Sequence, residues 1–503
     1  MSRRRRRFVT AGVMTGMLLA ALEGTVVGTA MPTIVAALGG LAHYSWVFSA
    51  YLLTSTVTVP VWGKLSDIFG RRRLFQYGVG VFLIGSALCG IAQTMTQLIV
   101  WRAVQGIGAG ALVPLAMTII GDIFTLEERA RMQGLFSGVW GVSSVFGPLV
   151  GGFITDQLSW RWVFLINVPV GIAAALIIGF TLIEPKREER TSIDFLGATV
   201  LTAAVTMLLL VLGDGSSPAK LVHARNLALI AAIVALFVWF VRIEKRAANP
   251  IVPFALLRNR VVGVSIVVGF LAGVGMFAAI TFVPLLAQGV LGATATEAGS
   301  FLTPLMLSWV LASIVGGRLL IRMGSRGLVL GGLAFMTVGF ALLATFSRTT
   351  PRWILVGELI LIGTGLGLTM LTLLIAAQHS VPREQLGITT SLNQFSRSIG
   401  GAIGVALLGA MLAAGLAEFA QDPNALVNPE ARAHLAPADL AALQGALQRT
   451  LRTIFWACTA VTALALAYAI RIPPGKVGTH GGAGERMVVA EMTNIDAAHE
   501  PEA

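Results

Sequence analysis

The chain alternates, almost from end to end, between long apolar runs and short polar segments. A helix needs about 20 apolar residues to cross the hydrocarbon core of a bilayer, and only helices or closed barrels satisfy their backbone there. Counting runs of about 18 to 25 residues gives about fourteen candidate helices. They cover residues 9–30, 44–63, 74–93, 97–117, 133–155, 162–183, 195–213, 224–242, 261–288, 299–320, 327–346, 353–376, 393–416 and 453–471. The sequence therefore predicts an all-α membrane protein.

Composition supports this class and excludes others. Apolar residues make up 56% of the 503 residues and charged residues 12%, against about 25% charged residues in soluble domains. The net charge of +12 comes from basic residues in short clusters between the apolar runs, which is typical of topology signals that also contact lipid headgroups rather than of nucleic-acid binding. Cys89 and Cys458 both lie within apolar runs, so we expect neither a disulfide nor a metal site.

Known catalytic patterns are missing from the sequence. There is no Gly-x-x-x-x-Gly-Lys-Ser/Thr loop that would bind ATP, and the six histidines are scattered without metal-ligand spacing. The sequence contains no arrangement of a serine nucleophile or of paired catalytic acids. We therefore expect a protein that is not an enzyme and that uses neither a cofactor nor a metal.

Lysine and arginine set the orientation. With the arginine-rich start on the inside, most of the 36 basic residues fall in inside loops and ends, as the positive-inside rule requires. An even number of spans puts both termini in the cytoplasm, and we expect a bacterial cytoplasmic (inner) membrane. The expected domains are a six-helix half, an inserted helix pair, a second six-helix half with an external loop at about 418–452 that contains one or two short helices, and a disordered tail. These domains span residues 1–190, 191–245, 246–472 and 473–503. In a twelve-helix alternative, the two runs of the inserted pair would not count as membrane spans.

One short hairpin between the second and third runs is unusually specific. Gly63, Asp67 and Gly70 precede three arginines, of which Arg71 and Arg72 are the first two. The glycines allow a sharp turn and a close approach of the two helices, and the arginines hold the loop in the cytoplasm. The segment resembles the G-x-L-x-D-x-x-G-R-R/K signature of major facilitator superfamily transporters, which implies a cytoplasmic gate.

The hairpin has a faint second copy. Residues 317–326 repeat its glycine and arginine spacing without the acid, and Gly106–Gly110 is echoed by Gly363–Gly367. Two repeats of this kind are expected if two six-helix halves flank the inserted pair. Substrate should then bind near the middle of the membrane, between the halves.

Glu23 is an acid about 21 Å into the first run, counting fourteen residues at 1.5 Å each. Such a carboxylate is costly in lipid, so it faces a cavity or a partner and can exchange a proton when its surroundings change. Its segment resembles the first-helix signature of fourteen-span drug:proton antiporters, L-D-x-T-V-V-N-x-A-x-P, with Glu23 replacing the aspartate and Gly28 the asparagine. The alternative is a structural acid paired permanently with an arginine.

Arg102 is the second charge inside a run. With Gln105 and the following glycines it resembles the superfamily's fourth-helix signature, R-x-x-Q-G-x-G-x-G. Arg102 and Glu23 are both expected in the outer half of the membrane, so they are candidates for a proton-coupling pair. Gln105 lies one turn further on as a polar neighbour. The alternative is that Arg102 extends to the outer headgroups.

Two further motifs indicate which branch of the major facilitator superfamily the chain resembles. Gly147, Pro148, Gly151 and Gly152 resemble the G-P-x-x-G-G fifth-helix motif of antiporters, which implies export; close helix packing without directional meaning is the alternative. Residues 160–171 resemble the W-R-W-I-F-x-I-N-V-P-x-G segment of the fourteen-span branch. The resemblance covers about residues 9–471.

Further polar and aromatic residues within the runs are candidates for a substrate cavity. Glu358 could be a second proton site, a cation contact, a partner of an arginine or an interfacial acid. The candidate cavity set is Gln105, Trp140, Glu358, Asn393 and Gln394, with Arg397, Gln378 and Gln288 as further polar groups.

These observations and the resemblance imply a proton-coupled multidrug exporter that moves amphipathic small molecules, cations among them, by alternating access. The expected partners are small lipophilic substrates, protons and membrane lipids, with no nucleic acid, and the protein is expected to be a monomer. One alternative is a dedicated exporter of a metabolite, lipid or siderophore with the same mechanism. A non-transporting membrane sensor is the other.

Overall fold

The computed structural model describes residues 3–124, 126–182, 195–213, 224–247, 250, 254–382, 385–417 and 436–474. Within these residues every regular element is a helix. The long helices of the first part are α1 (Arg3–Leu38), α2 (Tyr44–Phe69), α3 (Arg71–Gly90), α4 (Met95–Ile123), α5 (Leu126–Gln157) and α7 (Asn167–Thr181). Those that follow are α8 (Phe195–Gly213), α10 (Ala224–Glu244), α12 (Arg260–Leu285), α13 (Ala295–Leu343), α14 (Arg352–His379), α15 (Leu386–Leu416) and α17 (Pro437–Ala469). Short pieces are η1 (Leu41–His43), α6 (Trp162–Leu165), α11 (Phe254–Leu257) and η2 (Leu286–Val290).

Ten helical segments of the described chain are long and apolar enough to cross a membrane. Large apolar side chains point outward from the bundle; Phe180 is 81% exposed and Trp353 74%. Such exposure is unfavourable in water and favourable in lipid. The structure thus agrees with an all-helical membrane protein, and the helices α2, α5, α8 and α10 overlap further expected runs without belonging to the ten.

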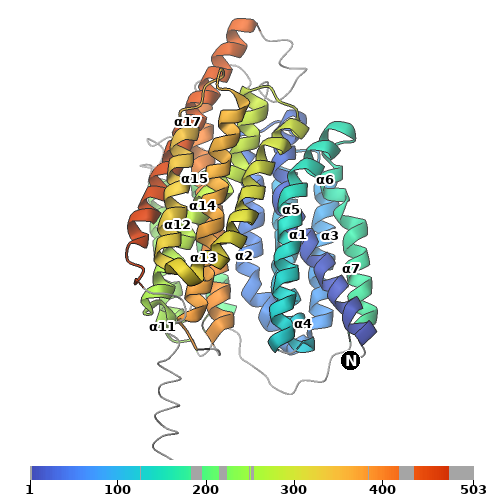
Figure 1. Cartoon of the computed structure of the whole chain (residues 1–503). Helices are drawn as coiled ribbons and strands as arrows, with labels where there is room; N and C mark the ends of the chain where they lie inside the picture. Colours follow the sequence, from blue (N-terminus) through green and yellow to red (C-terminus); the bar gives the residue numbers. More distant parts are fainter. Residues whose placement is uncertain are drawn as a thin grey trace, which may run out of the picture.

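The helices form two bundles that stand side by side (Figure 1). In the first half, α4 packs against α2 and α3, and α1 packs against α5 and α7. In the second half, α13 packs against α14 and α17, and α12 packs against α15. We call the end of the bundle where α1 begins the N-terminal end and the opposite end the far end.

The glycine repeat seen in the sequence has matching geometry in the two halves. Gly70, between α2 and α3, has φ 93° and ψ 144°, and Gly324, which breaks α13 into two parts, has φ 76° and ψ 167°. A positive φ is accessible to glycine and strained for other residues. The two positions hold corresponding turns, so the expected copy of the hairpin is present.

The second glycine pattern also has the same role in each half. A Cβ on Gly106 would lie 2.6 Å from the Tyr51 carbonyl of α2, and one on Gly108 would lie 2.2 Å from the Phe82 nitrogen of α3. In the second half, Gly363 and Gly365 are equally close to backbone atoms of the two parts of α13. Glycine at alternate positions therefore lets one helix contact two neighbours at backbone distance.

The two halves meet along α5 with α13 and along α2 with α15. Hydrogen bonds between the halves also lie at the far end: the Gln288 side chain of η2 donates to the Thr29 carbonyl of α1 (2.9 Å), and the Tyr44 hydroxyl of α2 donates to the Thr281 carbonyl of α12 (2.8 Å). Asp156 of α5 accepts the backbone N–H of Thr296 at the start of α13 (2.7 Å). The far end is thus the closed side of the molecule.

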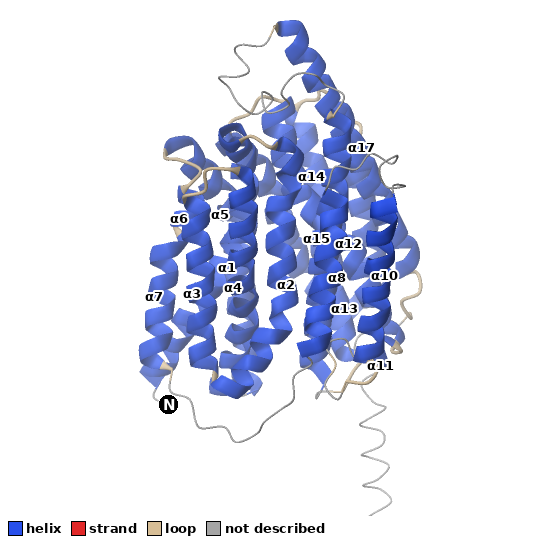
Figure 2. Cartoon of the chain, turned by 180° about the vertical axis from the view of Figure 1, so that it is seen from behind, coloured by secondary structure: helices blue, strands red, loops and turns tan. Residues whose placement is uncertain are grey.

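The helices α8 and α10 pack on one another beside the contact between the halves, as Figure 2 shows from behind. Val200 and Leu201 of α8 and Phe240 of α10 form a buried cluster with Leu53 of α2 and Ile399 of α15. The pair therefore touches both halves.

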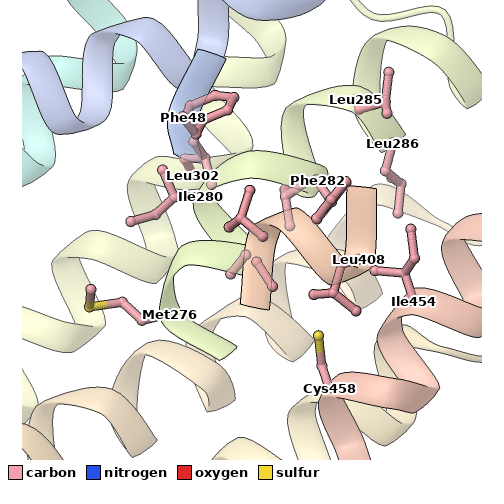
Figure 3. Close-up of a cluster of buried hydrophobic side chains, with 14 of the residues drawn as sticks. Phe48, Met276, Ile280, Phe282, Leu285, Leu286, Leu302, Leu408, Ile454 and Cys458 are labelled. Carbon is pink, nitrogen blue, oxygen red and sulfur yellow. The ribbon is translucent and has the colours of Figure 1, made fainter. Parts of the chain in front are cut away.

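The largest apolar cluster joins the halves at the far end. Figure 3 shows Phe48 of α2 together with Ile280 and Phe282 of α12, and Leu408 of α15 with Ile454 of α17. The ring of Tyr44 stacks on that of Phe282 with centroids 6.2 Å apart. This burial stabilises the closed far end.

The structure corrects two local expectations. Residues 437–452, expected in an external loop with one or two short helices, instead form the first part of the continuous helix α17, because Leu443, Leu447 and Leu451 recur at helical spacing and are buried. Gly63 was expected to form a turn but lies inside α2, and no described atom lies within 4 Å of its Cβ position. Residues 183–194, residues 418–435 and the tail beyond residue 474 lie outside the described residues.

Candidate functional site

The first half encloses a charged pair. Arg102 of α4 donates through Nη1 to Oε1 of Glu23 on α1, and each residue is 2% exposed. Both were expected from the sequence as a coupling pair, and the structure brings them together. The alternative position for Arg102, at the outer headgroups, is therefore wrong.

Neutral side chains satisfy the remaining polar atoms of the pair. Asn167 of α7 donates to Oε2 of Glu23 (2.7 Å), and Nη1 of Arg102 also donates to Oε1 of Gln105 (2.8 Å). The Ser86 hydroxyl of α3 accepts from both amides, at 3.0 Å from Asn167 and 3.1 Å from Gln105, and donates to the Phe164 carbonyl. A buried ion pair costs little only when its other donors and acceptors are also paired, which is the case here.

The guanidinium of Arg102 is also enclosed by backbone and aromatic groups. Its Nε donates to the Val47 carbonyl of α2 (3.2 Å), and its Cζ lies 4.1 Å from the ring centroid of Tyr51. The face of an aromatic ring attracts a cation, more strongly where water is excluded. Six helices of the first half, α1, α2, α3, α4, α6 and α7, therefore contribute to one buried polar network.

Sequence reasoning found Glu23, Arg102 and Gln105 but missed Asn167, Ser86 and Tyr51. Asn167 stands inside an apolar run, which was the available signal. Gln105 was expected to line a cavity, but it is fully buried within the network.

The expected gating residues lie at the N-terminal end of the bundle. Arg71 begins α3 and donates from Nη1 to the Thr118 carbonyl of α4 (3.0 Å), while Arg72 is exposed. The side chain of Asp67 is outside the described part of the structure, so its role in a gate stays a prediction.

The Gly-Pro-Leu-Val-Gly-Gly segment of α5 lies at the contact between α1 and α13. A Cβ on Gly147 would lie 2.1 Å from Oγ1 of Thr25, and one on Gly151 would lie 2.5 Å from Oγ1 of Thr29. Gly152 faces the other half, where a Cβ would lie 2.6 Å from the Ala295 carbonyl oxygen. Pro148 lies inside the helix, and its carbonyl is where a Cβ on Gly299 would collide.

The remaining cavity candidates lie in the second half or outside the described side chains. Glu358 of α14 is 5% exposed, and its Oε2 has no hydrogen-bond partner. Asn393 of α15 is buried and Gln394 is exposed, where it accepts from Arg397. The side chain of Trp140 is not described. In the described residues no group of three or more histidines, cysteines or acids could hold a metal ion.

Comparison with known proteins identifies the family. The model of the Major Facilitator Superfamily matches residues 13–405. The multidrug transporter protein MdtP of Bacillus subtilis (strain 168) is 42% identical over 408 residues, covering 81% of this chain and 75% of that protein. Multidrug resistance protein 3 of the same organism is 38% identical over 403 residues, covering 80% and 79%.

Solved structures show the same fold at low identity. A bacterial homologue of the human lysosomal transporter Spinster, in an inward-facing and unoccupied conformation, superposes with a TM-score of 0.67 at 18% identity and covers 94% of this chain and 98% of its own. A D-xylose–proton symporter gives a TM-score of 0.61 at 13% identity, covering 94% and 98%. The chain belongs to the Major Facilitator Superfamily and is a multi-pass membrane transporter, not an enzyme.

Proposed function

We propose that this transporter exports amphipathic small molecules from the cytoplasm in exchange for protons. The observation that carries the proposal is the Glu23 carboxylate, buried within the first half and held by Arg102 and Asn167. A carboxylate at this depth can bind a proton when its ion pair opens, and an intramembrane acid of this kind is by default a functional group. The two multidrug relatives support a broad range of substrates.

The exchange proceeds by alternating access between the two halves. The closed far end corresponds to the outer side, because the arginine-rich N-terminal end is expected in the cytoplasm. In the outward-open state Glu23 takes a proton, which weakens its bond to Arg102 and frees the halves to rearrange. In the inward-open state the proton leaves, and the ion pair forms again.

The driving force is sufficient for efflux. One proton crossing about 100 mV contributes about 2.3 kcal/mol, and each pH unit adds about 1.4 kcal/mol. A gradient of that size sustains accumulation ratios of about tens to hundreds.

The finer assignments belong to the same proposal. We place the chain in the fourteen-span drug:proton antiporter branch, with α8 and α10 as the inserted pair between the halves 1–190 and 246–472. We place both termini in the cytoplasm of a bacterial cell and assign Gly147, Pro148, Gly151 and Gly152 to the packing that favours exchange over symport. The Asp67 hairpin is assigned to the cytoplasmic gate.

Proton release on substrate addition tests the proposal directly. Purified protein in weakly buffered detergent receives lipophilic cations and amphipathic acids in turn, and the pH is recorded. We expect release from the native protein and from the exposed-acid control Glu297→Gln, and none from Glu23→Gln. Undiminished release from a folded Glu23→Gln variant contradicts the assignment of Glu23.

A further inference from the structure

The second half carries a membrane-embedded arginine that the ion pair of the first half does not involve. Arg397 lies on α15, which begins at Leu386, so 397 − 386 = 11 residues separate them. At 1.5 Å per residue this is about 16 Å from the start of the helix, roughly a third of the way along its 31 residues. Arg397 is half-buried, and its Nε has no acceptor.

The neighbours of α15 show which way this side chain faces. Ser396 donates to the Ile266 carbonyl of α12 (2.7 Å), whereas the Ala402 carbonyl accepts from Ser49 of α2 (3.3 Å). Ile399 packs on the opposite side against α8 and α10. With 3.6 residues per turn, Arg397 and Gln394 occupy the face between α12 and α2, which is turned toward the first half.

This face is open and rich in unpaired donors. Gln394 is exposed although its face is turned toward the first half, and it accepts from Nη2 of Arg397. Asn393, one turn before Arg397, is 7% exposed, and its Nδ2 lacks an acceptor. Buried donors without acceptors are costly, so a pair of them on one helix is suited to a ligand that brings acceptor oxygens.

The membrane-embedded arginines of the two halves also differ in whether an acid neutralises them. Arg102 is neutralised by Glu23, whereas no acid among the described residues forms an ion pair with Arg397. Glu358, the buried acid of the second half, is also not paired with it. A guanidinium recognises carboxylates through two parallel hydrogen bonds, and the recognition is stronger where water is scarce.

We propose that Arg397 and Asn393 form a binding site for the anionic group of an amphipathic substrate, a carboxylate in the first instance. This site rests on the proposed export function. It narrows the substrates of the proposed exporter to amphipathic molecules that carry an anionic group. It departs from the expectation of cationic substrates, because the described face of α15 offers donors and positive charge. Gln394 positions the guanidinium by accepting a hydrogen bond from Nη2 of Arg397.

Binding of a matched acid and ester tests this site without requiring transport. The probes are dansylaminoundecanoic acid and its methyl ester, added to purified full-length protein while dansyl fluorescence is followed. We expect the native protein to bind the acid about tenfold more tightly than the ester, a difference of about 1.4 kcal/mol. Arg397→Gln should remove that preference by weakening the acid and leaving the ester unchanged.

Three variants separate recognition from misfolding. Arg397→Lys keeps the charge and should retain part of the preference, and Asn393→Ala should reduce it. Arg352→Gln, an exposed arginine at the far end, should leave it intact. If Arg397→Gln yields no folded protein, a selective loss of acid affinity in Asn393→Ala supports the site, and an unchanged preference there overturns it.

The outcomes also separate this site from the proposed exchange. Equal affinity of the native protein for acid and ester, or an acid preference that survives in a folded Arg397→Gln variant, overturns the anion site whatever the proton measurements give. Acid preference without substrate-linked proton release supports the site and contradicts the exchange mechanism.

Discussion

Asn167 donates a 2.7 Å hydrogen bond from its side-chain amide to Oε2 of Glu23, which ties α7 to α1 inside the first half. Arg102 bonds the other oxygen of the same carboxylate. The amide can remain bonded to a carboxyl oxygen whether or not Glu23 carries a proton, whereas the ion pair depends on the charge. Asn167 therefore holds the acid in place while its bond to Arg102 forms and opens.

Replacing Asn167 with alanine should expose this role. The variant loses a buried hydrogen bond to a charged group, so we expect the free energy of unfolding to fall by about 1–3 kcal/mol and the pH dependence of export to change. In a Glu23→Gln background the loss of stability should be smaller, because the charge is gone. Thermal unfolding in detergent measures both; equal losses in the two backgrounds would mean that Asn167 contributes packing alone.

Removing Arg102 should be more damaging than removing both charges. Arg102→Gln leaves the Glu23 carboxylate buried without a counter-charge, which costs about 3–5 kcal/mol in comparable buried pairs. Adding Glu23→Gln should restore part of that loss. Arg161→Gln is a matched control, because Arg161 donates to the carbonyls of Gly90 and Ala92 and pairs with no described acid. If Glu23→Gln stabilises Arg161→Gln as much as Arg102→Gln, the recovery does not come from the ion pair.

The sequence allowed Glu23 and Arg102 to be predicted because hydrocarbon strongly penalises charge, which makes each stand out in an apolar run. Ser86 gave no such signal. Hydroxyl side chains in membrane helices commonly bond to the carbonyl one turn earlier, as Thr10 and Thr462 do here. A serine that joins a network across helices cannot be told from these by sequence alone.

Some features of the fold could likewise be predicted from the sequence, and others could not. The glycines of the two halves were informative, since a positive φ or a backbone contact restricts the residue type at Gly70 and Gly106. The beginning of α17 at Pro437 was not predicted, because its first turns are alanine-rich and partly charged. From Leu443 onward the apolar side of α17 rests on other helices, a contact that the periodicity indicates only once the partner surface is known.

Two glycines of the same hairpin should respond differently to alanine. Gly70 has φ 93° and ψ 144°, a conformation that is strained for residues other than glycine, so Gly70→Ala should cost about 1–3 kcal/mol of stability. Gly63 is helical and no described atom lies within 4 Å of its Cβ position, so Gly63→Ala should leave the unfolding temperature unchanged or slightly higher. Thermal unfolding compares the two, and a similar drop in both would contradict the turn geometry. Lost export in the stable Gly63→Ala variant is expected if this glycine allows a close helix contact in the outward-open state.

Gly152 should control the closure of the far end. A Cβ there would lie 2.6 Å from both the Ala295 carbonyl oxygen and the Thr296 Cα of the other half, and backbone atoms at the start of α13 cannot rotate away. Asp156 bonds the same turn. Alanine should therefore separate the far ends of α5 and α13 and favour the outward-open state. We expect the fold itself to be kept, because Gly152 faces the other half.

Gly141 on the same helix supplies the matched control for Gly152→Ala. A Cβ at Gly141 would lie 3.5 Å from Cγ1 of Val310 on α13, which is an ordinary van der Waals contact. Pulsed electron paramagnetic resonance between spin labels at the far ends of α5 and α13 measures the closure. We expect longer distances and slower export in Gly152→Ala, with native values in Gly141→Ala. Unchanged distances in Gly152→Ala would show that the closed far end tolerates a methyl group. The close contact between α5 and α13 would then not be the reason why residue 152 is a glycine.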